Sequence, residues 1–116
     1  MSEEKLLVRM SVVAHKNAYV VEIMLWEDGP GVSLWMLVDP DMLDSGVGID
    51  FSLSEVDEFV KAMYQGMPMN GVAIPVANED VPFVAGVLYN AAFRASAYLE
   101  LIGYKSLKEV YGDDLT

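Results

Sequence analysis

Residue types that commonly carry chemistry are sparse in this chain. It has one histidine, His15, and no cysteine, so the sequence offers neither a Cys–His pair nor a metal site with several histidine ligands. His15 stands beside an expected hairpin turn, where a lone histidine is usually a solvated turn residue. We therefore expect no catalytic residue, no bound metal and no cofactor.

Four carboxylates within twelve residues form the most metal-like feature: Asp39, Asp41, Asp44 and Asp50. Such oxygen ligands suit a hard cation such as Ca²⁺. The spacing departs from an EF-hand loop, because Leu43 takes the fifth position and Asp44 replaces the glycine at the sixth. Asp-Pro-Asp and Asp-Ser-Gly are also common turn sequences. A solvated acidic loop is thus favoured over a cation site, and over catalysis by paired carboxylates.

Arg94 is the sole basic residue in the long apolar stretch from 78 to 103, and Asn90 precedes it by one helical turn. An arginine in this setting usually extends to solvent or pairs with a carboxylate. As an alternative, Arg94 and Asn90 could line an anion-binding pocket between a helix and a sheet. That alternative predicts a protein that binds a small molecule or an anion.

The net charge constrains the partners of the chain. Eighteen acids and seven Lys or Arg residues give −11, which disfavours direct nucleic-acid binding, because phosphate contacts need Lys and Arg. Between Asp39 and Asp80 nine acids accompany one base, Lys61. Such a segment steers basic partners and raises their association rate. The residues that we expect to provide this steering are Asp41, Asp44, Asp57 and Glu58.

Three segments in the first third of the chain alternate apolar and other residues: 6–14, 19–26 and 32–38. A period of two is typical of strands that bury one face. The segments follow one another closely, with turn residues between them. We therefore expect a three-stranded antiparallel meander, with a short fourth strand at 47–49.

The expected turns set the register of this meander. A turn through Lys16–Asn17 would pair Ala14 with Tyr19. The sequence DGPG would form the next turn and pair Ile23 with Met36. Both registers place the apolar residues of all three strands on one face, whereas a shift by one residue would scatter them over both faces.

The opposite face of the expected sheet is more apolar than a face open to water should be. On it Met24 is expected to lie opposite Trp35. Aromatic residues and methionine are enriched at protein interfaces, so we favour a contact surface for another subunit or another protein over a second core layer. The residues of this predicted interface are Met24, Trp26, Trp35 and Leu37.

A helix is expected to begin after Ser52, because Ser52 and Glu55 form a capping box. Gly66 suits its end. The following segment, 72–77, contains Pro75, which favours either a short edge strand or an extended loop.

A second and longer helix is expected over 78–103. Its apolar residues surround the cylinder, a property of buried helices, so it should lie at the centre of the fold or between subunits. Small residues along it would permit a second close contact. Ser106 and Glu109 form another capping box, which predicts a short terminal helix.

Together these elements predict a single α+β domain over 1–116. An antiparallel meander of three or four strands precedes helices packed on one face, with a long buried C-terminal helix. The N-terminus lacks the apolar core of a signal peptide, and Arg94 disfavours 81–102 as a membrane span. A cytoplasmic location without membrane contact is therefore expected.

The favoured function is a non-enzymatic acidic binding or inhibitor protein that docks on a basic protein partner as a homodimer. An inhibitor of a nucleic-acid enzyme or an immunity-type protein would act in this way, an analogy that rests on composition. The alternative is the small-molecule or anion-binding protein with a pocket near Arg94 and Asn90.

Overall fold

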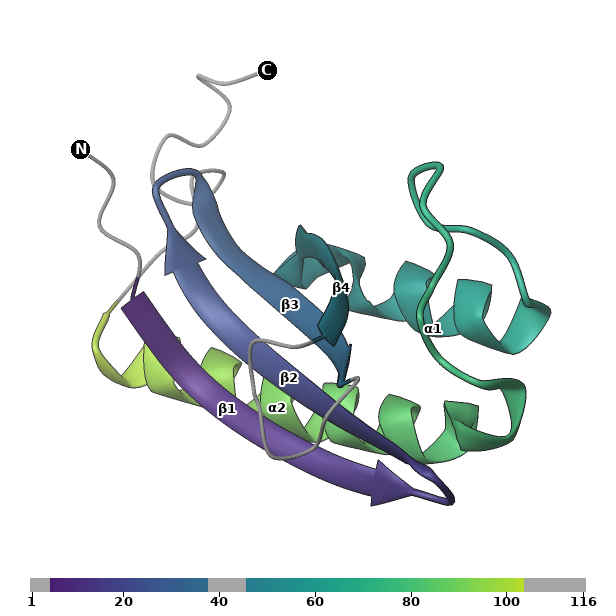
Figure 1. Ribbon diagram of the computed structural model, residues 1–116. Coiled ribbons are helices and arrows are strands. Elements are labelled where there is room, and N and C mark those ends of the chain that lie inside the picture. Colours follow the sequence, from purple (N-terminus) through teal and green to yellow (C-terminus); the bar gives the residue numbers. More distant parts are fainter. Residues whose placement is uncertain (1–4, 38–45, 104–116) are drawn as a thin grey trace.

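The computed structural model describes residues 5–37 and 46–103 (Figure 1). In these ranges one antiparallel sheet has the strand order β1 (Lys5–Ala14), β2 (Asn17–Trp26), β3 (Gly29–Leu37) and β4 (Gly46–Ser52). The helices that follow are η1 (Leu53–Glu55), α1 (Val56–Gln65), η2 (Asn78–Asp80) and α2 (Val81–Leu101). Both α-helices lie on the same face of the sheet. The predicted α+β meander with helices on one face is confirmed.

The hairpin between β1 and β2 is tighter than expected. Ala14 lies opposite Asn17 and not opposite Tyr19, so the predicted register is wrong by two residues. The physical reason is the conformation of His15, whose φ of +56° suits the two-residue turns that join right-twisted strands.

The hairpin between β2 and β3 is tighter as well. Trp26 lies opposite Gly29, and Ile23 pairs with Val32 in place of Met36, so this register is wrong by four residues. Gly29 has a φ of +129° and already belongs to β3, which leaves only two residues for the turn. Because both errors are even numbers, the predicted division of residues between the two faces still holds for most of these strands. The exception is the start of β1, where a bulge between Leu6 and Val8 puts Leu6 opposite Met24 and Leu7 against the main core. The alternation predicted from residue 6 therefore holds only from Val8 onward.

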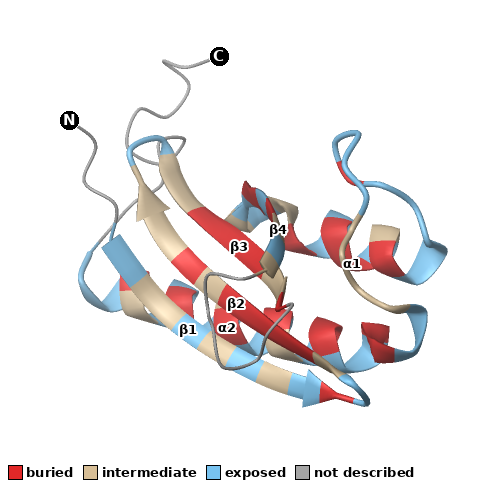
Figure 2. Cartoon of the chain, in the orientation of Figure 1, coloured by how far each residue is buried: buried red, intermediate tan, exposed pale blue. Residues whose placement is uncertain are grey.

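The face of the sheet that the helices cover holds the main core (Figure 2). Its fully buried side chains come from β2, β3, α1 and α2. They are Tyr19, Val21, Ile23, Val32, Leu34, Phe59, Val84, Leu88, Ala91 and Ala95. Each large aliphatic or aromatic side chain here contributes roughly 1.5–3 kcal/mol by leaving water, so this face holds the fold together.

The junction from β4 into α1 follows the predicted capping box. The Ser52 N–H donates to Glu55 Oε1 at 3.0 Å. Phe51 then stacks on Phe59, with ring centroids 4.1 Å apart, which ties the end of β4 to the helix. Gly66 ends α1 in the left-handed conformation, at φ +66°.

Helix α2 packs against β1 and β2 along one side. Its other side is exposed, and Phe93 keeps 76% of its surface accessible. The long helix thus lies on the sheet as predicted, but its apolar residues are covered on one side of the cylinder only. Within 5–37 and 46–103 no helix is both long and apolar enough to cross a membrane. The predicted helix at Ser106 and Glu109 lies outside the described residues.

Candidate functional site

Two tryptophans lie flat on the face of the sheet opposite the helices. A Cβ added at Gly31 would come within 1.8 Å of the Trp26 ring, and one added at Gly48 within 2.7 Å of the Trp35 ring. Each indole therefore occupies the space that a side chain on the neighbouring strand would fill. Glycine inside a strand commonly marks such a close approach. Both rings keep part of their surface accessible. Each therefore lies against the sheet and still presents some of its surface to solvent.

The two indoles border a shallow hollow of about 390 Å³ on the open face, which we call the indole hollow. It is lined by Glu22, Met24, Trp26, Ser33, Trp35 and Asp50. The apolar part of this lining consists of the two indoles and Met24, and its charged part is anionic. The combination suits a ligand that is cationic and partly apolar.

Both carboxylates of the indole hollow have a partner within the chain. Asp50 Oδ1 accepts a hydrogen bond from Ser33 Oγ at 2.6 Å. Glu22 Oε2 accepts from Arg9 Nε at 2.8 Å and lies 2.6 Å from Arg9 Nη2. Arg9 is half-exposed, so this ion pair is solvated and able to exchange partners.

Three of the four predicted interface residues line this hollow: Met24, Trp26 and Trp35. The fourth, Leu37, is only 8% exposed and packs with Val20 and Trp35 beside the hollow. Met24 lies opposite Gly31 and not opposite Trp35. That pairing was predicted wrongly, because the register between β2 and β3 is shifted by four residues.

The predicted steering residues lie elsewhere. Asp57 and Glu58 are exposed in the first turn of α1, on the helix side of the sheet. Asp57 Oδ1 accepts a hydrogen bond from the Tyr89 hydroxyl at 2.8 Å, and this bond raises the pKa of Tyr89. Asp41 and Asp44 lie outside the described residues. The Asp57 and Glu58 carboxylates therefore do not line the indole hollow.

Asn90 and Arg94 are both exposed on α2, and Arg94 Nε donates to Asn90 Oδ1 at 2.9 Å. Asn90 borders an open depression of about 660 Å³ together with Tyr89 and Phe93, but Arg94 is not part of that lining. The two side chains thus bond to each other on the outer surface of the helix. They do not lie between helix and sheet, where the predicted anion pocket would be.

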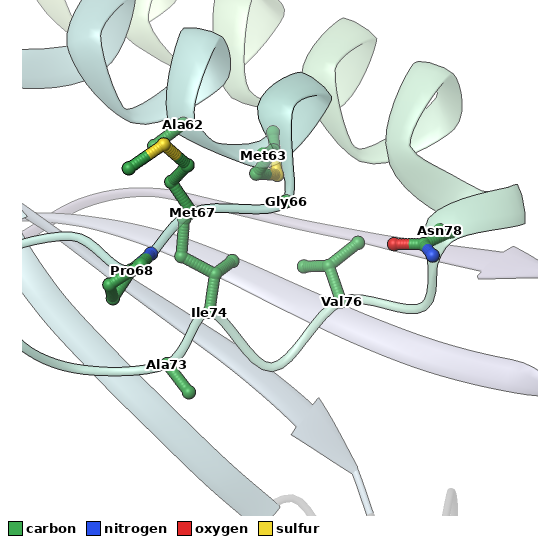
Figure 3. A pocket seen from close by; sticks show the side chains of 9 residues that line it. All are labelled: Ala62, Met63, Gly66, Met67, Pro68, Ala73, Ile74, Val76 and Asn78. Atoms are coloured by element: carbon green, nitrogen blue, oxygen red, sulfur yellow. The ribbon is translucent and has the colours of Figure 1, made fainter.

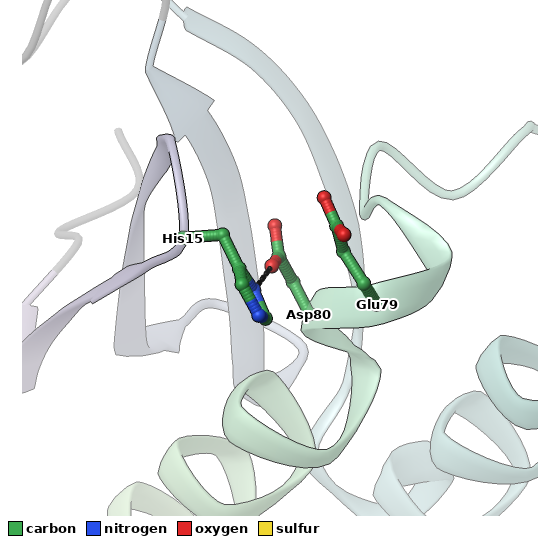
Figure 4. A group of neighbouring side chains, drawn as sticks. All are labelled: His15, Glu79 and Asp80. Carbon is green, nitrogen blue, oxygen red and sulfur yellow. Dashed lines mark hydrogen bonds and ion pairs between the residues drawn. The ribbon is translucent and has the colours of Figure 1, made fainter.

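A buried polar network, which we call the Asp80 network, joins the β1–β2 turn to the start of α2 (Figure 4). Asp80 has no exposed surface. Its Oδ2 accepts from the Tyr19 hydroxyl at 2.6 Å and from Asn17 Nδ2 at 2.9 Å, while His15 Nδ1 lies 2.6 Å from Oδ1. The Tyr19 hydroxyl also accepts the Ala77 N–H at 3.2 Å. Both oxygens of the carboxylate are engaged.

These contacts set the charge state of the network. Burial raises the pKa of Asp80, but the hydrogen bonds from Tyr19, Asn17 and His15 together outweigh it and hold that pKa below its usual value. Burial, reinforced by the bond to Asp80, raises the pKa of Tyr19 to about 12. At neutral pH the network therefore contains a carboxylate and an uncharged phenol.

Glu79 adds a third potential metal ligand beside His15 and Asp80. His15, Glu79 and Asp80 lie side by side (Figure 4), and one ligand atom from each lies within 4.8 Å of the others. Imidazole and carboxylate ligands suit divalent transition metals. A metal here would have to displace the bond between His15 and Asp80, however. The hydrogen bonds alone explain the geometry: they connect the β1–β2 turn to the start of α2.

Sequence reasoning missed the Asp80 network. It assigned His15 to a solvated turn and Asp80 to the start of a helix, and the Asp80 side chain makes no capping bond. Asn17 and Tyr19 alternate as strand residues do, but their partner is more than sixty positions away. Only the packing of α2 on the sheet brings these groups together.

A third cavity, of about 320 Å³, lies between the end of α1 and the chain that returns to α2 (Figure 3). Met67, Ile74 and Val76 supply apolar walls, and Asn78 is the polar side chain of its lining. Ligand sites usually combine an apolar wall with several convergent polar groups. This lining offers little to orient a ligand.

The indole hollow is thus the described surface whose shape and chemistry best define a ligand class. Comparison of the chain with protein-family models, with curated proteins and with solved structures finds no significant match.

Proposed function

We propose that this protein is a non-enzymatic acidic binding protein whose indole hollow takes a basic segment of a partner protein. The observation that carries the proposal is the pair of partly exposed indoles, each lying against a glycine and bordered by Glu22 and Asp50. A Lys or Arg side chain over an indole face gains roughly 0.5–2 kcal/mol, depending on how far it is desolvated. The two carboxylates add ion-pair partners for the same cation.

Preorganisation supports this role. The Trp26 and Trp35 rings already lie against Gly31 and Gly48 in the free protein. Binding then loses little side-chain entropy, and rigid aromatic anchors are effective for that reason. Trp26 and Trp35 therefore need little rearrangement to contact a ligand.

Charge supports a basic partner over an acidic one. The net charge of −11 attracts basic proteins over a distance and raises their association rate. The exposed Asp57 and Glu58 on α1 contribute to this field without touching the hollow. An inhibitor of a nucleic-acid enzyme, or an immunity-type protein, would meet such a basic surface on its target. A cytoplasmic location and the lack of direct nucleic-acid binding remain predictions from the sequence.

The alternative, an anion or small-molecule site at Asn90 and Arg94, has less support. Arg94 is hydrogen-bonded to Asn90 on the exposed side of α2, and the net charge of −11 disfavours the approach of an anionic ligand.

Fluorescence anisotropy of a dye-labelled peptide tests the proposal without relying on the protein's own tryptophans. The probe is an unstructured peptide of alternating Arg and Gly, and its matched control replaces every Arg by Gln. We expect the Arg peptide alone to bind, with an affinity that falls as salt rises. Trp35→Leu should weaken binding roughly tenfold or more, in line with the loss of an aromatic anchor.

The control variant is Tyr64→Leu, which removes an exposed aromatic ring from α1 on the other side of the molecule. It should bind the Arg peptide as the wild type does. Equal affinity for the Arg and Gln peptides, or full binding by Trp35→Leu, would contradict the proposal. Circular dichroism of each variant separates loss of binding from loss of fold.

A further inference from the structure

The outer side of α2 carries a second exposed surface, which we call the α2 stripe. Its members alternate at spacings of three and four residues and so share one side of the helix. They are Phe83, Gly86, Asn90, Phe93 and Ala97. All five are exposed, with Phe83 at 52% and Phe93 at 76%. None of them is charged. The helices cover the sheet face opposite to the indole hollow (Figure 1), so this surface is separate from the proposed peptide site.

Gly86 is the member of the α2 stripe that most clearly indicates an external contact. It lies inside a helix, where glycine is less favourable than alanine. Among the described residues a Cβ added there would meet nothing within 4 Å, so the packing of this part of the chain does not require a glycine. A residue without a side chain at an exposed helical position permits the close approach of a group from outside the chain.

We propose that the α2 stripe is the contact by which two copies of this chain form a dimer, with their α2 helices antiparallel and a two-fold axis near Asn90. Around such an axis, residues at equal or nearly equal distances on either side of Asn90 face each other. Phe83 and Ala97 lie seven positions on either side of Asn90, and Gly86 and Phe93 lie four and three positions from it. Each phenylalanine of one copy thus meets a small residue of the other, and ridges fit into grooves.

Charge identifies a second copy as the occupant. A chain of net charge −11 repels itself over most of its surface, but α2 contains only one acid, Glu100, and one base, Arg94, in its 21 residues. The stripe also lacks the carboxylates that would attract a basic partner. Asn90, whose Oδ1 accepts from Arg94 Nε, would meet its own copy near the axis. A polar residue in an apolar helix seam commonly fixes register and orientation. At 1.5 Å per residue α2 extends about 31 Å, long enough for several such layers.

Light scattering coupled to size exclusion, over a wide concentration series, measures the expected dimer. Phe93→Glu places two like charges near the axis and should raise the dimer dissociation constant roughly tenfold or more. Val13→Glu is the matched control, because Val13 is 75% exposed on β1 and the charge change is the same. It should leave the dimer intact.

Two further variants keep the test decisive if Phe93→Glu does not fold. Gly86→Ala should raise the melting temperature measured at low concentration, since alanine is the better helix former, and yet weaken the dimer. Because the chain has no cysteine, Asn90→Cys should form a disulfide-linked dimer on mild oxidation, which needs Cα atoms within about 7 Å. Val13→Cys should not.

A wild-type chain that stays monomeric over the whole series would overturn the inference. So would a Phe93→Glu variant that dimerises like the wild type, or equal cross-linking through Asn90→Cys and Val13→Cys. The Arg-peptide assay is independent of these outcomes, because Phe93 lies on the helix side and the peptide site on the open face of the sheet.

Discussion

The two faces of the sheet follow the same alternation but hold their aromatic residues in different ways. On the covered face Tyr19 is fully buried, and its hydroxyl is bonded to the buried Asp80. On the open face Trp35 lies against the bare backbone at Gly48 and packs beside Val20 and Leu37, and part of its surface remains accessible. A side chain that is buried on all sides stabilises the fold. A side chain that is only partly buried can be ordered and still contact a ligand.

The carboxylates of the two faces differ in the same way. Asp80 has no exposed surface and accepts bonds from three side chains. Glu22 keeps 20% of its side chain exposed and pairs with Arg9, which is 52% exposed. A buried charge that loses its partners is costly, whereas a solvated ion pair contributes little to stability. Substitutions on the covered face should therefore lower stability, and those on the open face should alter binding.

Asp80→Ala should have the largest effect. It leaves the Tyr19 hydroxyl and the Asn17 amide without their acceptor in the interior, and loss of one side of a buried charged network costs about 3–5 kcal/mol. Urea unfolding measures this loss. The control is Glu79→Ala, an exposed neighbour that should change stability by less than about 0.5 kcal/mol. Similar values for the two variants would mean that the Asp80 network does not hold the helix to the sheet.

The acid limb of the stability curve tests the same network. Because the pKa of Asp80 is lower in the folded protein than in the unfolded chain, its contribution is present above the unfolded pKa of about 3.9 and is lost as pH falls through the folded pKa. Asp80→Asn cannot titrate at this position. Its stability should therefore fall less steeply than that of the wild type below about pH 4.

Tyr19→Phe should have an intermediate effect of about 1.5–3 kcal/mol, since it removes the hydrogen bond to the charged Asp80 and also the acceptor of the Ala77 N–H. Its pH dependence has the opposite direction. The pKa of Tyr19 is raised to about 12 in the folded protein, so its contribution is complete below the unfolded pKa of about 10 and is lost as pH rises towards the folded value.

Unfolding measured across the alkaline range checks this prediction. The stability difference between wild type and Tyr19→Phe should shrink from about pH 10 upward. A constant difference over that range would mean that the Tyr19 phenol does not titrate differently in the folded state. A phenol absorbance titration of the folded wild type should also show ionisation of a tyrosine near pH 12.

The covered face could be predicted from sequence because a period of two is preserved under even errors of register. Ile23 faces the helices whether its partner is Met36 or Val32. The turn lengths could not be predicted as readily, because they depend on His15 and Gly29 taking positive φ. Alternation alone does not specify that choice.

The candidate site could be predicted from the sequence only in part. Met24, Trp26 and Trp35 stood out as residues too apolar for an open face, and they do line one hollow. The positions of the rings depend on glycines of neighbouring strands, and so on the register. Asp50 joins them only because β4 pairs with β3, whereas the sequence placed it in an acidic loop.

Arg9→Gln should have the smallest effect on stability and the clearest effect on binding. The Arg9–Glu22 pair is solvated, so its loss should cost less than about 1 kcal/mol in urea unfolding. Glu22 would then be released into the indole hollow. The Arg peptide should bind several-fold more tightly, with a steeper dependence on salt.

Arg94→Gln is the matched control for this change. It alters the net charge by the same amount, but its partner is Asn90 on α2, away from the hollow. If net charge alone governs the peptide, both variants should bind it equally more tightly. If the hollow is the site, Arg9→Gln should exceed Arg94→Gln, because the freed carboxylate lies beside the indoles and the effect of a distant charge is screened within about 10 Å at moderate salt. Equal gains would therefore place the peptide elsewhere and remove the functional contrast between the two faces of the sheet.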